Sequence, residues 1–439
     1  MQSNKIGIGC RTKKNFLIVS NSLEMKAIER HTYSDLLVKL AVELYLFTNC
    51  GFQKVSDLIC YLNNFFKLGL ERTPCANSIE NWVKKSGYHI YHQNPSDFSE
   101  KNYATIVDES MMLGSEKMLL TLGVEAEKTN DNALKHNDIK VLNISVAEKW
   151  NSESVKENLK ETEKKVGHSS LYSISDNDTK LRKAFRERGS LWIRDIGHTI
   201  ALLIEKVYGE DACFKELTKN LSAVKIREVM RPSSYLLPPR QRTMARFMNL
   251  STIIQWAIKI YNNFSKLSNE EAKNFTFVKK HFPLIEELEQ IFNCVNEILK
   301  QAKNEGYSKK KIKSYIRKIK KNLTIQSSRV QQVKLSLCEY LEEEKQKIPT
   351  SKNNWHCSSD IIESLLGIYK QRQSRNKLNG VTPYVLVIPL VAAAGHKSKP
   401  SNIDFKEKLE NVFMKDLTQW KSDNLTENLV VKRRKKLVA

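Results

Sequence analysis

Three closely spaced apolar runs between residues 103 and 146 constrain the fold of this chain more than any other feature. The runs are rich in β-branched and aliphatic residues and have the length of strands, with polar segments between them. They cover residues 103–107, 118–124 and 139–146. A charged helical segment and two further short runs, 170–175 and 191–193, follow. Consecutive strands followed by strands that alternate with helices predict an α/β fold with a mixed sheet.

The region before the strands has the periodicity of helices. Apolar residues recur every three or four positions in 34–47 and 55–66, and a third helix is expected over 75–85, ended by Gly87. This is the layout of a helix-turn-helix DNA-binding domain, expected within residues 1–98. A three-helix cap without DNA contacts is the alternative. On the third helix, the predicted base-reading residues are Asn77 and Asn81, and the predicted phosphate contacts are Lys84 and Lys85.

Residues 199–347 show only helical spacing. Within them, Lys309–Leu323 predicts a basic amphipathic helix with cations around an apolar stripe, and 231–246 predicts a basic non-helical bridge. Because the cations of the amphipathic helix come without matching acids, phosphate contacts are expected there rather than a merely solvated face. The expected contacts are Lys310, Lys313, Arg317 and Lys320.

The charge balance narrows the class of partner. The chain has 72 Lys and Arg against 49 Asp and Glu, a net charge of +23, in an otherwise ordinary composition with 41% hydrophobic residues. Such a surplus attracts polyanions, so nucleic acid is the first expected partner. No membrane association is expected, because the most apolar stretch, 381–395, is short and contains two prolines. The eight cysteines lack zinc-site spacing, which indicates reduced thiols in the cytoplasm.

Three acidic residues are candidates for metal-dependent chemistry. Asp108 and Asp176 each follow an apolar run, in TIVDES and SISDND, and Glu363 lies on the first turn of a predicted helix, in DIIESLLGIYKQR. Strand ends and helix starts can converge at one edge of a sheet. Ligands that are oxygen only suit Mg²⁺ or Mn²⁺, and two such ions could act on both sides of a phosphodiester.

Each of these acids also has a structural interpretation. An Asp after a strand often forms a turn, and Asp360 with Glu363 could be a helix capping box. Glu109, Asp178 and Asp360 are rival ligands close to the three candidates. The residues alone leave these alternatives open.

Taken in order, the three blocks resemble those of bacterial insertion-sequence transposases of the DDE type, which belong to the RNase H-like and retroviral-integrase superfamily. The resemblance covers most of the chain. It implies an RNase H-like catalytic core in two parts, 99–198 and 348–397, interrupted by an all-helical insertion at 199–347. A basic tail follows at 398–439, and its end, 432–436, is expected to be disordered. By this resemblance, Asp108, Asp176 and Glu363 hold two Mg²⁺ or Mn²⁺ ions.

The same resemblance implies roles for further residues. Asp195 and His198 match a C/DxxH motif of hAT- and Mutator-like transposases, although a helix-start Asp with a core His is equally expected. Trp192, Trp256 or Trp355 could stack on a flipped base, but a core position is the better expectation for each. The residues implied to meet the cleaved strand, with solvated surface as the alternative, are Arg372, Arg375 and Lys377, and Lys370 could join them.

The implied activity is cleavage at transposon ends and strand transfer into target DNA. The implied partner is double-stranded DNA, bound by a homodimer or higher synaptic oligomer at the bacterial nucleoid. A nuclease or junction resolvase of the same superfamily, without strand transfer, is one alternative. The other is a catalytically silent, transposase-derived DNA-binding regulator.

Overall fold

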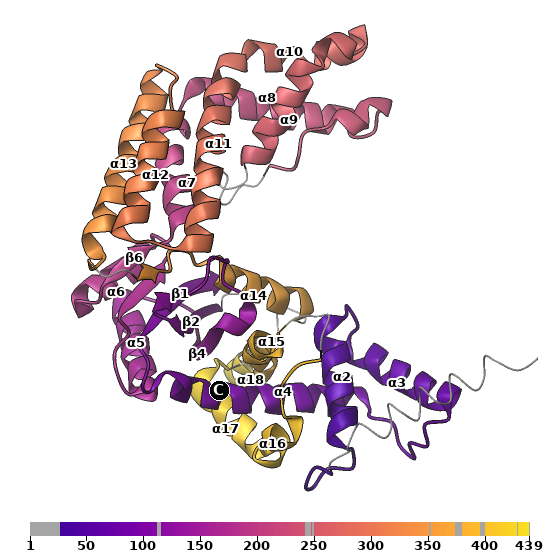
Figure 1. The fold of residues 1–439 in the computed structure, drawn as a ribbon. Coiled ribbons are helices and arrows are strands. Elements are labelled where there is room, and N and C mark those ends of the chain that lie inside the picture. Colours follow the sequence, from indigo (N-terminus) through magenta and orange to yellow (C-terminus); the bar gives the residue numbers. More distant parts are fainter. Residues whose placement is uncertain are drawn as a thin grey trace, which may run out of the picture.

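A five-stranded mixed sheet lies between a long helical bundle and a group of N- and C-terminal helices (Figure 1). The chain is therefore an α/β protein, as the strand runs predict. The computed structural model describes residues 27–438 except 112–115, 242–246, 248–249, 351–352, 374–379, 396–399 and 428.

The predicted strand runs all form strands of this sheet. The strands are β1 (Tyr103–Met111), β2 (Lys117–Glu125), β4 (Ile139–Ala147), β5 (Tyr172–Ser175) and β6 (Trp192–Arg194). Their order across the sheet is β4-β2-β1-β5-β6. Strand β2 is antiparallel to both of its neighbours, whereas β1, β5 and β6 run parallel to one another. Two short strands, β3 (Glu127–Lys128) and β7 (Asn354–Trp355), form a separate antiparallel pair.

Strand β1 is longer than its sequence pattern predicts. The apolar run predicts an end at Asp108, but the pairing with β2 continues through Asp108 and Glu109 to Met111, so this prediction is wrong. The physical reason is the antiparallel partner: β2 supplies backbone hydrogen bonds along the whole of β1, even where polar residues break the apolar run. The parallel partner β5 pairs only as far as Ile106.

Helices cover both faces of the sheet. On one face, α5 (Ser152–Val166) and α6 (Thr179–Arg188) pack through Val155 and Phe185 against Val107 and Leu119. The opposite face carries Ile106, Leu120 and Ile174, which belong to the main core together with helices from both ends of the chain. Alternate residues of β1 therefore face different layers, as the two-residue period of a strand requires.

The N-terminal region contains α2 (Asp35–Phe47), α3 (Phe52–Phe66) and α4 (Ala76–Gln93), followed by the 3₁₀ turn η1 (Asn94–Phe98). The prediction that Gly87 ends the third helix is wrong, because α4 continues through it. A Cβ atom at Gly87 would lie 1.9 Å from the carbonyl oxygen of Leu386. The glycine thus allows a close approach between α4 and a C-terminal segment, which the sequence pattern could not reveal.

We expect Gly87→Ala to lower the free energy of unfolding by about 1–3 kcal/mol or more, because the Leu386 backbone would have to move. Gly367→Ala is the matched control, since Gly367 lies inside the helix Asp360–Arg372, where a Cβ atom would meet no neighbouring atom of the described residues within 4 Å. That control should raise stability by up to about 1 kcal/mol. Urea unfolding of the two variants measures both effects, and equal stabilities would contradict the close packing at Gly87.

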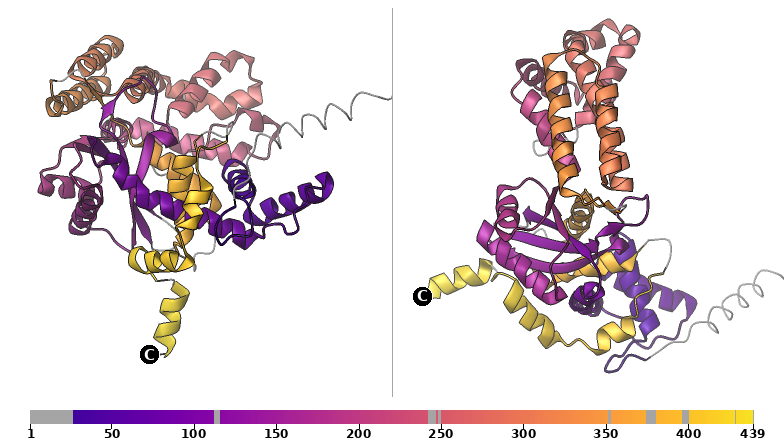
Figure 2. Two further views of the ribbon diagram at one scale, coloured as in Figure 1. Left: turned by 60° about the horizontal axis from the view of Figure 1, so that its bottom comes forward. Right: turned by 60° about the vertical axis from the view of Figure 1, so that its left-hand side comes forward.

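The predicted all-helical region forms the bundle. Its helices are α7 (Ile196–Tyr208), α8 (Ala212–Glu228), α9 (Leu250–Asn262), α10 (Asn269–Lys280), α11 (Phe282–Glu305), α12 (Lys309–Asn322) and α13 (Ser328–Lys347). The 3₁₀ turns η3 (Pro232–Leu236) and η5 (Phe264–Lys266) lie between helices of the bundle. The start of the predicted basic bridge thus contains the 3₁₀ turn η3, followed by residues 237–241 without regular secondary structure, and part of the rest lies outside the described residues. The bundle projects away from the sheet, with the C-terminal helices on the other side (Figure 2).

After the bundle the chain returns to the sheet. Its last elements are α14 (Asp360–Arg372), η6 (Pro383–Leu386), α15 (Val387–Ala394), α16 (Phe405–Glu410), α17 (Met414–Asn424) and α18 (Leu429–Val438). The prediction of a disordered tail is wrong, because 432–436 lies within α18, where Lys and Arg favour a helix and Lys435 pairs with Glu427. None of the described helices has the length and apolar character needed to cross a membrane.

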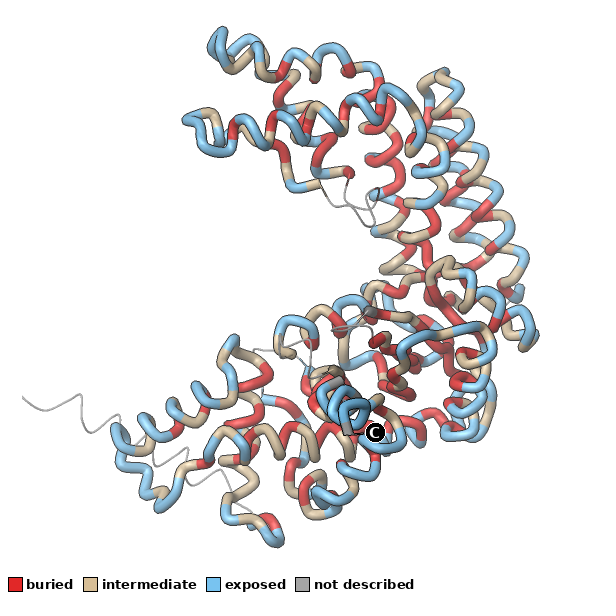
Figure 3. The backbone as a smooth tube through the Cα atoms, turned by 180° about the vertical axis from the view of Figure 1, so that it is seen from behind, coloured by how far each residue is buried: buried red, intermediate tan, exposed pale blue. Residues whose placement is uncertain are grey.

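One main core connects these regions. It contains residues of α2 to α4, of the sheet, of the bundle and of the C-terminal helices. Buried residues accordingly run from the sheet both into the bundle and into the N-terminal helices (Figure 3). Helix α4 packs against α15 and α16, so the N-terminal helices share their packing with the C-terminal part of the chain.

Candidate active site at the edge of the sheet

Two of the three candidate carboxylates lie on adjacent parallel strands. Ile106 of β1 pairs with Ile174 of β5, and Asp108 and Asp176 each lie two residues further on. Because side chains alternate along a strand, both aspartates are on the sheet face that carries these isoleucines. Asp108 is still paired with β2, whereas Asp176 directly follows β5. The two carboxylates therefore meet at the edge where the parallel strands end.

The third carboxylate reaches this edge from helix α14. Glu363 lies on the first turn of α14, and its side chain is 51% exposed. Further along the same helix, the Lys370 ammonium donates a hydrogen bond of 2.6 Å to the hydroxyl of Ser110 near the end of β1. Helix α14 is thus held against β1, with Glu363 and Lys370 on the side of Asp108.

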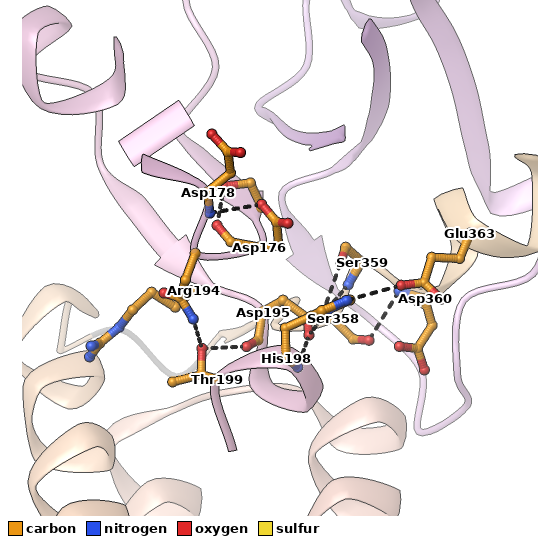
Figure 4. A network of polar contacts seen from close by, with 12 residues as sticks. Asp176, Asp178, Arg194, Asp195, His198, Thr199, Ser358, Ser359, Asp360 and Glu363 are labelled. Atoms are coloured by element: carbon orange, nitrogen blue, oxygen red, sulfur yellow. Dashed lines mark hydrogen bonds and ion pairs between the residues drawn. The ribbon is translucent and has the colours of Figure 1, made fainter. Parts of the chain in front are cut away.

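His198 connects Glu363 to the start of helix α7. Its Nε2 lies 3.2 Å from Oε1 of Glu363, and its Nδ1 lies 3.0 Å from Oδ1 of Asp195 (Figure 4). Hydrogen bonds to these two carboxylates raise the pKa of His198 to about 11. The imidazole is therefore protonated at neutral pH and donates to both acids.

Asp195 is the buried centre of this network. It caps α7 by accepting a hydrogen bond of 2.7 Å from the backbone N–H of His198. Its other oxygen accepts bonds of 2.6 Å and 3.1 Å from the backbone N–H and the hydroxyl of Ser359. Burial opposes the charge, but the bonds from His198 and Ser359 keep the pKa of Asp195 below its ordinary value. Asp195 thus ties the end of β6 to the start of α14, and so helps to position Glu363.

The rival acidic residues have structural partners of their own. Asp178 caps α6, accepting bonds of 2.7 Å and 3.4 Å from the backbone N–H groups of Lys180 and Leu181. Glu109, one residue beyond Asp108, forms ion pairs with Lys117 and Lys180. Asp360 forms an ion pair with Lys303.

The capping box predicted for Asp360 and Glu363 is not formed. The N-cap of α14 is Ser359, which makes no side-chain capping bond because its hydroxyl donates to Asp195. Glu363 is left to interact with His198 instead.

Asp108 is the least compensated of the acids. Within the part of the chain that the structure describes, its carboxylate has no hydrogen bond or ion pair. Burial, together with the charges of Asp176 and Glu363, raises its pKa to about 7, although His198 and Lys370 act in the opposite direction. Burial also raises the pKa of Asp176, while a backbone bond of 3.1 Å from Asp178 lowers it. A cation would relieve this repulsion between carboxylates.

The three carboxylates are near one another but are not gathered as a ligand set. Among the described residues, no group of three or more His, Cys, Asp or Glu side chains is arranged to hold a metal ion. Glu363 is bonded to His198 (Figure 4) and acts on Asp108 through its charge. The structure thus brings the predicted residues to one edge, with Glu363 held on the side of α7.

The predicted DNA contacts on α4 differ in their exposure. Asn77 is exposed, whereas Asn81 is only partly exposed, on a helix with several buried residues. Lys84 forms an ion pair of 3.0 Å with Glu80. Lys85 is partly buried, and burial lowers its pKa. Of the four predicted contacts on α4, Asn77 at its N-terminal turn is thus the one that is exposed.

The predicted contacts on α12 are all accessible. Lys310, Lys313, Arg317 and Lys320 are exposed, as is Lys321, and none has an ion pair with another described residue. The other basic residues of the helix are engaged: Lys318 pairs with Glu297, Lys311 pairs with Glu305, and Lys309 donates a hydrogen bond to the hydroxyl of Thr350. The outer face of α12 is therefore a cationic surface, defined by the five exposed residues, with its charge uncompensated by described acids.

The residues expected near the cleaved strand are only partly described. Arg372 donates bonds of 2.8 Å and 3.3 Å to the carbonyl oxygens of Leu46 and Thr48, and so holds the end of α2. Arg375 and Lys377 lie outside the described residues.

The three candidate tryptophans lie in different surroundings. Trp355 is buried and stacks on Tyr172 with ring centroids 4.3 Å apart, so the core position is confirmed. Trp256 is half-buried and donates a bond of 2.9 Å to the carbonyl oxygen of Leu236. Trp192 is also half-buried, between Phe185 and the Lys347 ammonium.

Two residues of the site were assigned no role from the sequence. Ser359 contacts Asp195, although the two residues are 164 positions apart in the sequence, with the helical bundle between them in the chain. Asn177 donates a bond of 2.9 Å to the hydroxyl of Thr199, which joins the Asp176 loop to α7. Ser359 lies outside the three blocks, and Asn177 lies within SISDND but was given no role there; only the folded chain brings each to its partner.

Comparison with protein-family models gives no match for this chain, and a comparison with curated protein sequences finds no similar protein.

Proposed function

We propose that this chain is a DNA transposase of the DDE type that cleaves transposon ends and transfers the strands to target DNA. The observation that carries the proposal is that Asp108 and Asp176 each lie two residues beyond the last pair of the adjacent parallel strands β1 and β5, with Glu363 near enough for its charge to raise the pKa of Asp108. The order β4-β2-β1-β5-β6, with β2 alone antiparallel, supports an RNase H-like core. In this proposal the bundle, α7 to α13, is an insertion between β6 and α14.

The donor set fits a hard divalent cation. Asp108 has no described partner and lies among like charges, and the three candidate ligands supply only oxygen atoms. Bound there, a pair of Mg²⁺ or Mn²⁺ ions would activate a water or 3′-hydroxyl nucleophile and stabilise the leaving oxygen. The chain's own contribution is to hold the carboxylates: β1 and β5 fix the aspartates, and His198 and Asp195 orient Glu363. Lys370, beside Asp108, supplies positive charge at the same edge.

DNA is the proposed substrate because the exposed cations of α12 are not balanced by described acids. The outer face of α12 carries five exposed cations without described ion-pair partners. Such a face suits phosphates of any sequence, whereas reading of the transposon end is assigned to the helix-turn-helix region around Asn77. Assembly as a dimer or higher synaptic complex is part of the proposal.

Replacing Lys310, Lys313, Lys320 and Lys321 of α12 by glutamine should weaken binding to all DNA sequences alike. The slope of log affinity against log salt should fall by up to about 0.9 for every phosphate that the variant no longer touches. The matched control replaces Lys311 and Lys318, whose ammonium groups are already paired with acids. Fluorescence anisotropy across a salt series measures both proteins. If the salt slope of the quadruple variant is unchanged, α12 is not part of the DNA-binding surface.

The proposed activity is tested with linear DNA that carries the sequences flanking the reading frame. Purified protein with Mg²⁺ or Mn²⁺ should nick or cut at the ends and join them to a target plasmid. Cutting without joining would favour a nuclease or resolvase of the same superfamily. Specific binding with neither reaction would favour a silent DNA-binding regulator.

A further inference from the structure

A groove beside the candidate active site remains without a role in the proposed chemistry. It has a volume of about 630 Å³ and lies between α6, β6 and α13. Asn177, which follows Asp176 in the chain, is one of its lining residues, and this is the groove's connection to the candidate site. The charged lining residues are Arg182, Arg186, Arg194, Lys347 and Glu343. The lining thus contains four cationic side chains and one acidic side chain.

The cations of the groove are of two kinds. Arg194 is fixed by bonds of 2.6 Å to each of Glu343 and Glu344, and Lys347 by a bond of 2.9 Å to Glu344. In contrast, Arg182 and Arg186 are exposed on α6, and neither guanidinium has a hydrogen bond or ion pair with any described residue. The fixed pair therefore shapes one wall, while the two arginines leave their donors available to a ligand.

The spacing and the lining indicate what the ligand is. Arg182 and Arg186 are one helical turn apart, roughly 5–6 Å between Cβ atoms, so they can contact successive anionic groups of one chain. Leu191 and Trp192 add an apolar surface that a sugar or base can cover and that a free phosphate does not need. The volume is within the range of small-ligand sites, roughly 300–1,000 Å³, which suits a short piece of one strand better than a duplex.

We propose that this groove binds the sugar–phosphate backbone of a single DNA strand, next to the catalytic carboxylates. Arg182 and Arg186 contact the phosphates, and Leu191 and Trp192 contact the sugars or bases. The proposal rests on the proposed function in taking DNA as the ligand. It adds a site for a strand that has been separated from its complement near the cleavage position.

The test compares Arg182→Gln/Arg186→Gln with the unchanged arginines, both in an Asp176→Ala background that prevents cleavage. The probes are a fluorescent oligothymidylate and a blunt duplex, each bound across a salt series. The double variant should bind the single strand on the order of tenfold more weakly, with a log–log salt slope smaller by about 0.7 for every phosphate that it no longer touches. Binding to the blunt duplex should change much less.

Two further variants separate phosphate contact from structural damage. Lys183→Gln is the matched control on the same helix, because Lys183 is exposed but paired with Glu187. This variant should bind the single strand as tightly, and with the same salt slope, as the Asp176→Ala protein with unchanged arginines. Arg182→Lys/Arg186→Lys should retain the salt slope, since the charge remains. If the glutamine variant keeps the parent slope, or loses single-strand and duplex binding equally, the groove is not a single-strand site. Displacement of the oligonucleotide by equimolar inorganic phosphate would also contradict the proposal that the groove binds a DNA strand.

Failure here is distinguishable from failure of the proposed function. If the protein cuts and joins DNA but the arginine pair has no effect on single-strand binding, the transposase proposal stands and the groove proposal is wrong. If the protein has no cleavage activity but its single-strand binding depends on the arginine pair, the groove proposal stands and the transposase proposal is wrong.

Discussion

Asp176→Ala is expected to abolish DNA cleavage and strand transfer, with a loss on the order of 10³-fold or more, and to leave DNA binding nearly unchanged. The proposed metals act on the reaction and require this carboxylate, whereas affinity comes mainly from cations distributed over the surface. Cleavage is measured on labelled end DNA with Mg²⁺ or Mn²⁺, and binding is measured on the same DNA without metal. Strand transfer at the parent rate in this variant would falsify the catalytic assignment.

Asp178→Ala is the matched control for this experiment. Asp178 is two residues away, but its carboxylate caps α6. Its removal should cost about 0.5–2 kcal/mol of stability and leave the chemistry in place. If Asp178→Ala instead abolished cleavage while Asp176→Ala did not, Asp178 would be the ligand and the capping bonds would have to be given up in the active enzyme.

Asp195→Ala should destabilise the fold by about 3–5 kcal/mol, the largest effect on stability that we expect. The change leaves a protonated imidazole and the Ser359 N–H and hydroxyl without their buried acceptor. Asp178→Ala again serves as control, because both aspartates cap a helix after a short strand but only Asp195 holds a histidine and a distant loop. Chemical unfolding of both variants measures the difference. Equal losses would show that Asp195 acts only as a cap.

The same network has a defined effect of pH in metal-free protein. The pKa of His198 is raised from its ordinary value of 6.5 to about 11 on folding. Its stabilising contribution is therefore fully present below pH 6.5 and is lost as the pH rises toward 11. In Asp195→Ala the pKa of His198 should fall, and the decline of stability with pH should become smaller.

Local sequence pattern predicts the main elements because their signals are local. The β-branched runs identify β1, β2 and β4, and the apolar stripe of 309–323 identifies α12 and the face that its cations occupy. Asp108, Asp176 and Glu363 stand out as residues beside such elements, and all three lie at the same edge of the sheet. These predictions need only the periods of strands and helices.

The predictions from the sequence are wrong where contacts with a distant segment determine the local structure. Gly87 does not end α4, because it packs against the backbone of Leu386. Asp108 does not end β1, because β2 continues to pair with it. In both cases the local pattern is typical of a break, but contacts with another element compensate for it.

The sequence by itself determined which residues could be strands, helices, metal ligands and phosphate contacts in this protein. Only the tertiary structure decided which acids are available: Glu109 and Asp360 are engaged by the distant Lys180 and Lys303, whereas Asp108 has no described partner. It also decided that Asp195 joins His198 to Ser359 and thereby holds Glu363. The physical reason is that a carboxylate's partner depends on which donors the fold brings within hydrogen-bonding distance, and donors that are distant in sequence leave no trace in the local pattern.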